Sequence, residues 1–210
     1  ELCRDYKVYL ILDEVFTGLG RVGENFAFKR AGITADIICL AKGLTGGNLP
    51  LAATLCTDDI FAAFLDEDRS KALLHGHTFT ANPIACAAAL ASLDIYREQD
   101  LVSKARTIES YCRYWIEKEQ HNLGLIAPRA VGGIMAFELE AGDYFHQAAY
   151  RIPELGRSHG LLLRTLGSTI YFVPPLMISE GELETGLAAL RKTIADYRKE
   201  STPSHNSART

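Results

Sequence analysis

The sequence predicts an α/β fold that is followed by a smaller α+β part. Two short apolar runs, "KVYLIL" (7–12) and "DIICLA" (36–41), end at polar or glycine-rich turns. Runs of this kind are typical of parallel strands that are covered on both faces. After Gly124 the pattern changes to short strands with one helix. We therefore expect two packed parts, 1–123 and 124–198, and a polar, disordered tail at 199–210.

The first part contains a third strand and two helices. The run "PLAATLCT" (50–57) predicts the strand, and the alanine-rich stretch 84–99 predicts a helix. Asn82 can cap this helix, and Pro83 suits its first position. A second helix is predicted over 101–121. Its apolar residues recur at helical spacing: Leu101, Ala105, Ile108, Cys112, Trp115 and Ile116.

The second part alternates strands and helices. Strands are predicted for "IMAFELE" (134–140), "LLLRT" (161–165) and "TIYFVPPL" (169–176), with a helix near 143–158. The closing helix begins with a capping box, in which Ser179 precedes Glu182 by three positions. We expect this helix to run to about Tyr197.

Composition and charge exclude several classes of protein. With 48% hydrophobic and 23% charged residues, the 210-residue chain is too apolar for a disordered protein. A net charge of -4 gives no basic patch for nucleic acid or an anionic membrane. No apolar run is long enough to span a bilayer. Without an initiator methionine, and with a strand pattern almost at residue 1, the chain is expected to be a fragment.

The cysteines and histidines predict neither disulfides nor a metal site. The cysteines lack C-x-x-C spacing and are expected to be small buried hydrophobes in a reducing cytosol, which predicts a cytoplasmic protein. His75 and His77 form an H-G-H sequence with no third ligand in view, so no metal is expected. The five cysteines are Cys3, Cys39, Cys56, Cys86 and Cys112.

Two opposite charges follow two neighbouring predicted strands. Asp13 comes directly after "VYLIL" and Lys42 directly after "DIICLA", at the strand ends where open α/β sheets bind ligands. Pyridoxal phosphate needs a lysine for its aldehyde and a carboxylate to keep its pyridine nitrogen protonated. The two residues alone leave a simpler alternative open, in which Asp13 caps a turn and Lys42 is a solvated loop lysine.

Three motifs together carry a family resemblance. They are "DEVFTGLGRVG" from Asp13, "AKGLTGG" around Lys42 and "HGHTFTANPIACAAALASL" from His75. In this order and spacing they resemble the class III pyridoxal-phosphate aminotransferases of fold type I, up to about Tyr197. The resemblance implies that 1–123 is the C-terminal part of the large cofactor-binding domain and that 124–198 is the small domain.

The resemblance also implies roles for individual residues. Asp13 would pair with the pyridine nitrogen, and Lys42 would be the Schiff-base lysine that moves a proton between substrate and cofactor. Thr78 would bind the cofactor phosphate, typically across a homodimer with shared active sites. His77 lies beside Thr78, and Gly76 would line the substrate site.

Two expectations concern the immediate surroundings of these residues. We expect Lys42 to be mobile, partly desolvated and reachable, with room left by Gly43, Gly46 and Gly47. The alternative for His75 and His77 is a simple turn before a helix.

The segment "LLLRTLGSTIYFVPPLMISEGEL" (161–183) points to one branch of the class. It resembles, with "LTGGNLPLAATL" (44–55), the transaminases of biotin synthesis that convert 8-amino-7-oxononanoate to 7,8-diaminononanoate with S-adenosylmethionine. By this resemblance Arg164 binds the keto acid carboxylate and Tyr171 lies in the substrate pocket. Alone, Arg164 could be a surface charge and Tyr171 a half-buried strand aromatic.

Three functional alternatives stay open. The protein could be another class III transaminase that acts on an omega-amino acid or a diamine, lysine could be the amino donor, or the chain could be a noncatalytic remnant. Members of the class are longer, and the region before Asp13 would supply the phosphate loop and the aromatic that stacks on the cofactor. The present chain should therefore expose the edge of its first strand and an apolar face, which favours aggregation or partial folding.

Overall fold

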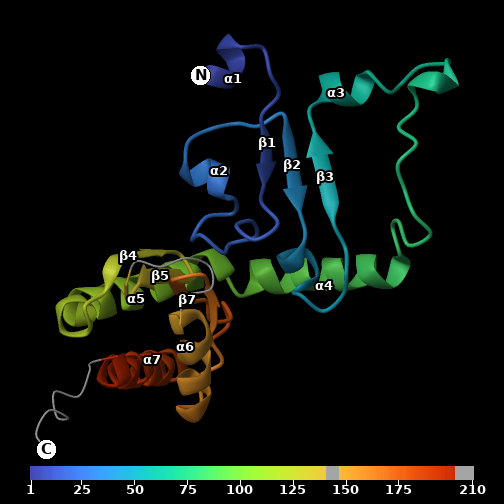
Figure 1. Ribbon diagram of the computed structural model, residues 1–210. Helices are drawn as coiled ribbons and strands as arrows, with labels where there is room; N and C mark the ends of the chain where they lie inside the picture. The colour runs from blue at the N-terminus through green and yellow to red at the C-terminus, as the bar shows by residue number, and fades with distance from the viewer. Residues whose placement is uncertain (141–146, 202–210) are drawn as a thin grey trace, which may run out of the picture. The chain divides into compact units, whose positions relative to one another are not determined.

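The computed structural model describes residues 1–140 and 147–201 (Figure 1). It divides into two compact units, 1–103 and 104–210. The division precedes the boundary expected near residue 123, because helix α5 (Leu101–Leu123) buries its apolar face in the core of the second unit. Residues 202–210 of the expected tail lie outside the described residues.

A three-stranded sheet organises the N-terminal unit (Figure 1). It contains β1 (Ile11–Asp13), β2 (Ile37–Leu40) and β3 (Ala53–Cys56) in the order β1-β2-β3. Strands β1 and β2 are parallel, and β3 is antiparallel to β2. The three predicted strands are confirmed, although each is shorter than its apolar run.

The expectation that the strands are covered on both faces is wrong for this chain. Ile11 of β1 is 58% exposed and Leu55 of β3 is 49% exposed. Strand β1 is also an edge strand, as expected. Too few helices pack against this sheet within the described residues to cover both of its faces.

The helices of the N-terminal unit are short except for α4 (Pro83–Glu98). The side chain of Asn82 accepts hydrogen bonds from the backbone N–H groups of Ile84 (3.0 Å) and Ala85 (3.2 Å), and Pro83 occupies the first turn. The predicted cap is therefore confirmed. The short helices and 3₁₀ turns lack the length for a recognisable period: α1 (Leu2–Asp5), α2 (Ala27–Arg30), η1 (Lys42–Thr45), α3 (Asp58–Ala62) and η2 (Arg69–Lys71).

The C-terminal unit packs helices α5, α6 (Gln147–Ser158) and α7 (Glu180–Ser201) with an antiparallel sheet. Its strand order is β4-β5-β7-β6. The strands are β4 (Ile126–Val131), β5 (Ile134–Glu138), β6 (Arg164–Leu166) and β7 (Thr169–Phe172). The core-facing residues alternate along β5 and β7, as period-two side chains must. They are Met135, Phe137, Ile170 and Phe172.

Strand β4 is the strand, among the described residues, that the sequence analysis missed. Pro128 lies inside it, and proline within a strand occurs on sheet edges or at bulges because it cannot donate to the ladder. β4 is an edge strand, and its register shifts between Ile126 and Arg129, with φ +45° at Ala127. The irregular backbone hides the alternation that would predict a strand.

The predicted capping box opens α7. The Ser179 N–H and Oγ–H donate to Glu182 Oε2 at 2.9 and 2.6 Å, and the Glu182 N–H returns a bond to Ser179 Oγ. The helix continues past Tyr197 to Ser201. The helix predicted near 143–158 begins at Gln147 in the structure, and 143–146 lie outside the described residues.

The cysteines match the expectation of burial only in part. Cys112 is buried, and burial together with nearby Glu109 raises the pKa of its thiol to about 12. Cys56 is exposed, because it lies on an uncovered strand. None of the helices in the described ranges is long and apolar enough to cross a membrane.

Removing the cap of α4 tests its contribution to the N-terminal unit. Asn82→Ala is expected to cost about 1 kcal/mol, because two backbone N–H groups lose their acceptor. Hydrogen exchange at the amides of Ile84 and Ala85 should become faster. Asn122→Ala is the control, since Asn122 donates only to a carbonyl within α5. Unchanged exchange in Asn82→Ala would contradict the capping role.

The capping box of α7 predicts a pH dependence. The Ser179 hydroxyl, and next the Ser179 N–H, lower the pKa of Glu182 below its ordinary value of 4.5. A lowered folded-state pKa stabilises the protein above 4.5, and this stability is lost as the pH falls through that folded-state pKa. The urea midpoint of wild type, followed by Trp115 fluorescence, should therefore fall toward that of Glu182→Gln on acidification. Glu184→Gln, on the same helix, should show no such convergence.

Candidate active site

Asp13 and Lys42 lie at the carboxyl ends of the parallel strands β1 and β2. Asp13 is opposite Cys39 in the strand register, and Lys42 follows shortly after Cys39. Asp13 Oδ1 accepts a hydrogen bond from the Val15 N–H at 2.9 Å, which is the turn-capping role of the simpler alternative. Its Oδ2 accepts none from the described residues, and the side chain is exposed. One carboxylate oxygen is thus open at the carboxyl end of the parallel strands.

The backbone of Lys42 is strained. Its φ angle is +42°, in the left-handed region that non-glycine residues rarely occupy. Such a conformation costs on the order of 1–3 kcal/mol and persists only where the surroundings enforce it. Here Gly46 (φ +62°) ends the η1 turn, and the Gly47 N–H donates to the Lys42 carbonyl at 2.9 Å. Strain of this kind is concentrated at functional sites.

Two hydroxyl side chains hold the turn of Lys42. Thr45 is only 2% exposed, and its Oγ1 donates to the Leu49 carbonyl at 2.6 Å. Ser92 of α4 donates from Oγ to the Gly43 carbonyl at 3.1 Å. The sequence analysis missed both residues. For Thr45 a signal was available. It is the hydroxyl residue in the run "AKGLTGG", which the sequence analysis interpreted only through its lysine and glycines.

The side chain of Lys42 is exposed and reachable. Its Nζ lies 5.1 Å from the centroid of the Phe16 ring and has no ion-pair partner among the described residues. The expected partial desolvation is therefore not found. The turn that carries Lys42 is made of small residues and lies at an uncovered sheet edge, so little in this chain can shield the amine.

Lys42 shares a pocket of about 960 Å³ with two other predicted residues, Gly76 and His77. Gly47 and Leu49 also line this pocket, whereas Asp13 and Thr78 do not. The segment before α4 thus meets the lysine turn, although the two are far apart in sequence.

His77 forms a turn before α4. Its Nδ1 accepts a hydrogen bond from the Phe79 N–H at 3.1 Å, and its own N–H donates to Thr80 Oγ1 at 2.9 Å. This geometry matches the alternative of a simple turn for His77. Thr78 is exposed in the same turn, and its hydroxyl has no partner among the described residues. No cluster of metal-ligating side chains occurs in the described ranges.

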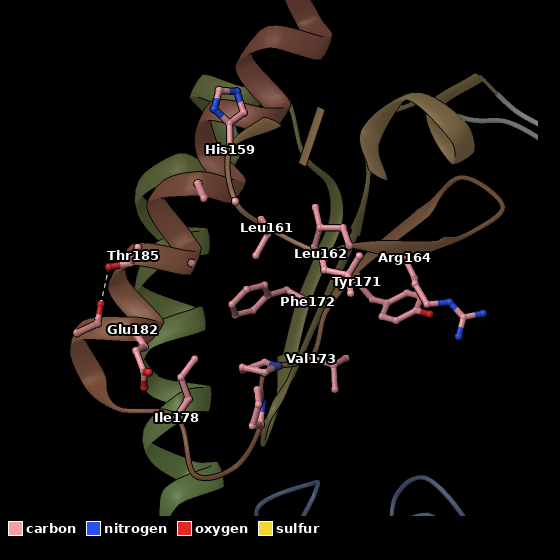
Figure 2. A pocket seen from close by; sticks show the side chains of 17 residues that line it. His159, Leu161, Leu162, Arg164, Tyr171, Phe172, Val173, Ile178, Glu182 and Thr185 are labelled. Carbon is pink, nitrogen blue, oxygen red and sulfur yellow. Dashed lines mark hydrogen bonds between the residues drawn. The ribbon is translucent and has the colours of Figure 1, made fainter. Parts of the chain in front are cut away.

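Arg164 and Tyr171 form a second candidate site, within the C-terminal unit. They are opposite each other on β6 and β7, and both line a pocket of about 560 Å³. Figure 2 shows both side chains on the side of the strands away from α7, whereas Phe172 points toward α7. Arg164 is exposed and has no ion-pair or hydrogen-bond partner in the described part of the chain. By contrast, Arg129 on the same sheet is bound to Glu138 at 3.0 Å.

Known proteins resemble the chain over nearly its whole length. Residues 1–194 match the family model "Aminotransferase class-III". The chain is 41% identical over 206 residues to an adenosylmethionine-8-amino-7-oxononanoate aminotransferase of Geobacter sulfurreducens, covering 92% of the chain and 45% of that protein. It is 37% identical over 199 residues to an omega-aminotransferase of Caulobacter vibrioides, covering 92% of the chain and 44% of that protein.

A solved structure agrees in fold. The amine transaminase of an uncultivated Pseudomonas species, in its PLP-bound form, superposes with a TM-score of 0.85 at 32% identity. The match covers 93% of this chain and 46% of that one. The chain thus spans about half the length of the relatives that it matches. It belongs to the class III aminotransferase family, whose members use pyridoxal 5'-phosphate.

Proposed function

We propose that the chain carries the catalytic lysine, the cofactor-binding aspartate and the substrate arginine of a biotin-synthesis transaminase. The enzyme would transfer an amino group from S-adenosylmethionine to 8-amino-7-oxononanoate, giving 7,8-diaminononanoate. The observation that carries the proposal is the strained, exposed Lys42 at the same sheet edge as Asp13. The similarity to the Geobacter protein supports the choice of substrates.

The residues present fit pyridoxal 5'-phosphate. The cofactor has an aldehyde that reacts with amines and a ring nitrogen that must stay protonated. Lys42 offers an amine that no described carboxylate holds, and Asp13 offers an oxygen without a hydrogen bond. When bound, pyridoxal phosphate supplies an electron sink that stabilises negative charge on the substrate carbon. Asp13 would maintain that sink by holding the proton on the ring nitrogen.

Lys42 has two tasks in this proposal. Its ε-amine would hold the cofactor, and as a free amine it would move a proton at the substrate carbon that bears the amino group. Both tasks need a side chain whose backbone is held in one position. The η1 turn, held by Thr45 and Ser92, provides that fixed position.

Arg164 is suited to the keto acid. A guanidinium binds a carboxylate through two parallel hydrogen bonds, and Arg164 has no competing partner among the described residues. The pocket that it lines with Tyr171 is mostly apolar, with Leu162 and Val173 among its walls. Such walls suit the hydrocarbon chain between the carboxylate and the ketone.

The remaining assignments concern the cofactor phosphate and the assembly. We propose that Thr78, with His77 beside it, binds the phosphate in a cytoplasmic homodimer. The support is the unpartnered hydroxyl of Thr78 on an exposed turn, which could reach a site on a second subunit.

A second candidate function is transamination of another omega-amino acid or diamine. The similarity to the Caulobacter omega-aminotransferase favours it. A noncatalytic role is the third candidate. Assays of the chain extended by its upstream coding sequence, with S-adenosylmethionine, lysine and omega-amino acids as donors, would separate the three.

Lys42→Ala should abolish covalent attachment of the cofactor. Wild-type protein, in the extended form, is expected to show a visible absorbance band with pyridoxal phosphate, and borohydride should fix the label on the peptide that contains Lys42. The variant should lose both the band and the label. Its activity should fall by at least about 10²- to 10⁴-fold. Lys29→Ala, which removes an exposed lysine of α2, is the control. Label on another lysine in the wild type would contradict the assignment.

Arg164→Ala should weaken binding of the keto acid. Loss of a charge-assisted pair costs about 1.5–3 kcal/mol, so KM for 8-amino-7-oxononanoate should rise about ten- to hundredfold. The first half-reaction, with the amino donor, should change little. Arg129→Ala is the matched control, because Arg129 lies on the same sheet but is bound to Glu138. If both variants raised KM equally, Arg164 would affect KM only by stabilising the sheet and would not bind the keto acid.

A further inference from the structure

Phe16 lies over the amine of Lys42, from the loop that follows β1. The ring centroid is 5.1 Å from Lys42 Nζ, within the roughly 6 Å over which an aromatic face attracts a cation. Phe16 is 43% exposed, so burial alone does not explain where its ring lies. The contact links the loop after β1 to the lysine after β2.

A buried carboxylate holds the loop that carries Phe16. Glu14 is 3% exposed, and its Oε2 accepts hydrogen bonds from Thr17 Oγ1 at 2.5 Å and the Ala27 N–H at 3.1 Å. Its Oε1 accepts one from the Phe28 N–H at 2.8 Å. Losing any of these three bonds would leave the buried carboxylate with fewer donors, which is costly. The loop is therefore fixed at a point close to Phe16.

The same loop also contacts the backbone of the lysine turn. A Cβ placed on Gly43 would lie 3.4 Å from Cβ and Cδ1 of Leu19. Leu19 itself has φ +57°, so the loop bends sharply where it meets the turn. Phe16 thus contacts the side chain of Lys42 while Leu19 contacts the backbone next to it.

We propose that Phe16 is a positioning residue, which holds the protonated Lys42 side chain against the loop after β1 until the amine gives its proton to solvent and can attack an aldehyde cofactor. The inference rests on the proposed role of Lys42 and adds one residue to it. A lysine has a flexible four-carbon stem and loses considerable rotamer freedom when it reacts. A ring that holds the ammonium restricts these rotamers before the reaction, and it also favours the protonated form, which cannot attack an aldehyde. The strength of an exposed cation–π contact corresponds to an effect of about two- to fivefold.

The first test needs no cofactor. Lysines of the extended protein, freed of cofactor, are reductively methylated with ¹³C-formaldehyde and a borane reductant, which keeps their charge, and are observed by NMR. The Lys42 signal, assigned with Lys42→Ala, should be shifted upfield by the Phe16 ring current. The shift should vanish in Phe16→Leu and persist in Phe16→Tyr. Phe61→Leu, at another exposed phenylalanine of the same unit, should leave it unchanged.

The second test measures reactivity. The same protein without methylation is treated briefly with pyridoxal phosphate and borohydride, and the label on Lys42 is compared with the label on Lys29. The ratio should rise about two- to fivefold in Phe16→Leu, because Lys42 loses its proton more readily without the ring, and stay constant in Phe16→Tyr and Phe61→Leu. Circular dichroism melts show whether the variants share the wild-type stability. A merely structural role for Phe16 would change the melt but not this ratio.

The outcomes are distinguishable. A Lys42 signal that is unshifted in the wild type, or still shifted in Phe16→Leu, overturns the positioning role, as does an unchanged labelling ratio. The Lys42 signal can also show a ring-current shift that depends on Phe16 while Lys42 takes up no cofactor. That result supports the contact between Phe16 and Lys42 and contradicts the proposed function.

Discussion

The parallel register of β1 and β2 is the constraint on which the candidate active site depends. Because Asp13 is opposite Cys39, the two chain segments leave the sheet at the same edge and at the same level. An antiparallel pairing would have carried their carboxyl ends to opposite edges. The register therefore brings Asp13 and the turn of Lys42 to the same end of the sheet before any side-chain packing is considered.

The backbone strain at Lys42 is maintained by its neighbours. A left-handed lysine would relax if the turn were held only by its own backbone. Thr45 and Ser92 bind the turn from within and from α4, while the loop fixed by Glu14 contacts it through Leu19. Two of these contacts are hydrogen bonds, so the turn keeps its shape although it lies at an exposed end of the sheet.

Local chemistry decided which features the sequence could predict. The caps at Asn82 and Ser179 fix helix starts through hydrogen bonds a few residues apart, so both helices were predicted with the correct first turn. β4 was missed because Pro128 and a bulge interrupt its alternation. Asp13 and Lys42 follow apolar runs and could be located, whereas the role of Glu14 depends on backbone N–H groups that only the folded loop brings near.

The two units differ in how their stability arises. The C-terminal unit has one continuous core of large side chains, from Ile108 to Tyr197. Among the described residues, the N-terminal unit buries only Val22, Leu40, Ala85 and Ala89 as hydrophobic side chains. So small a core cannot position Lys42 by packing alone. The lysine turn is accordingly shaped by hydrogen bonds. We infer that any segment covering β1 and the Lys42 amine would remove water from the amine without having to shape the turn.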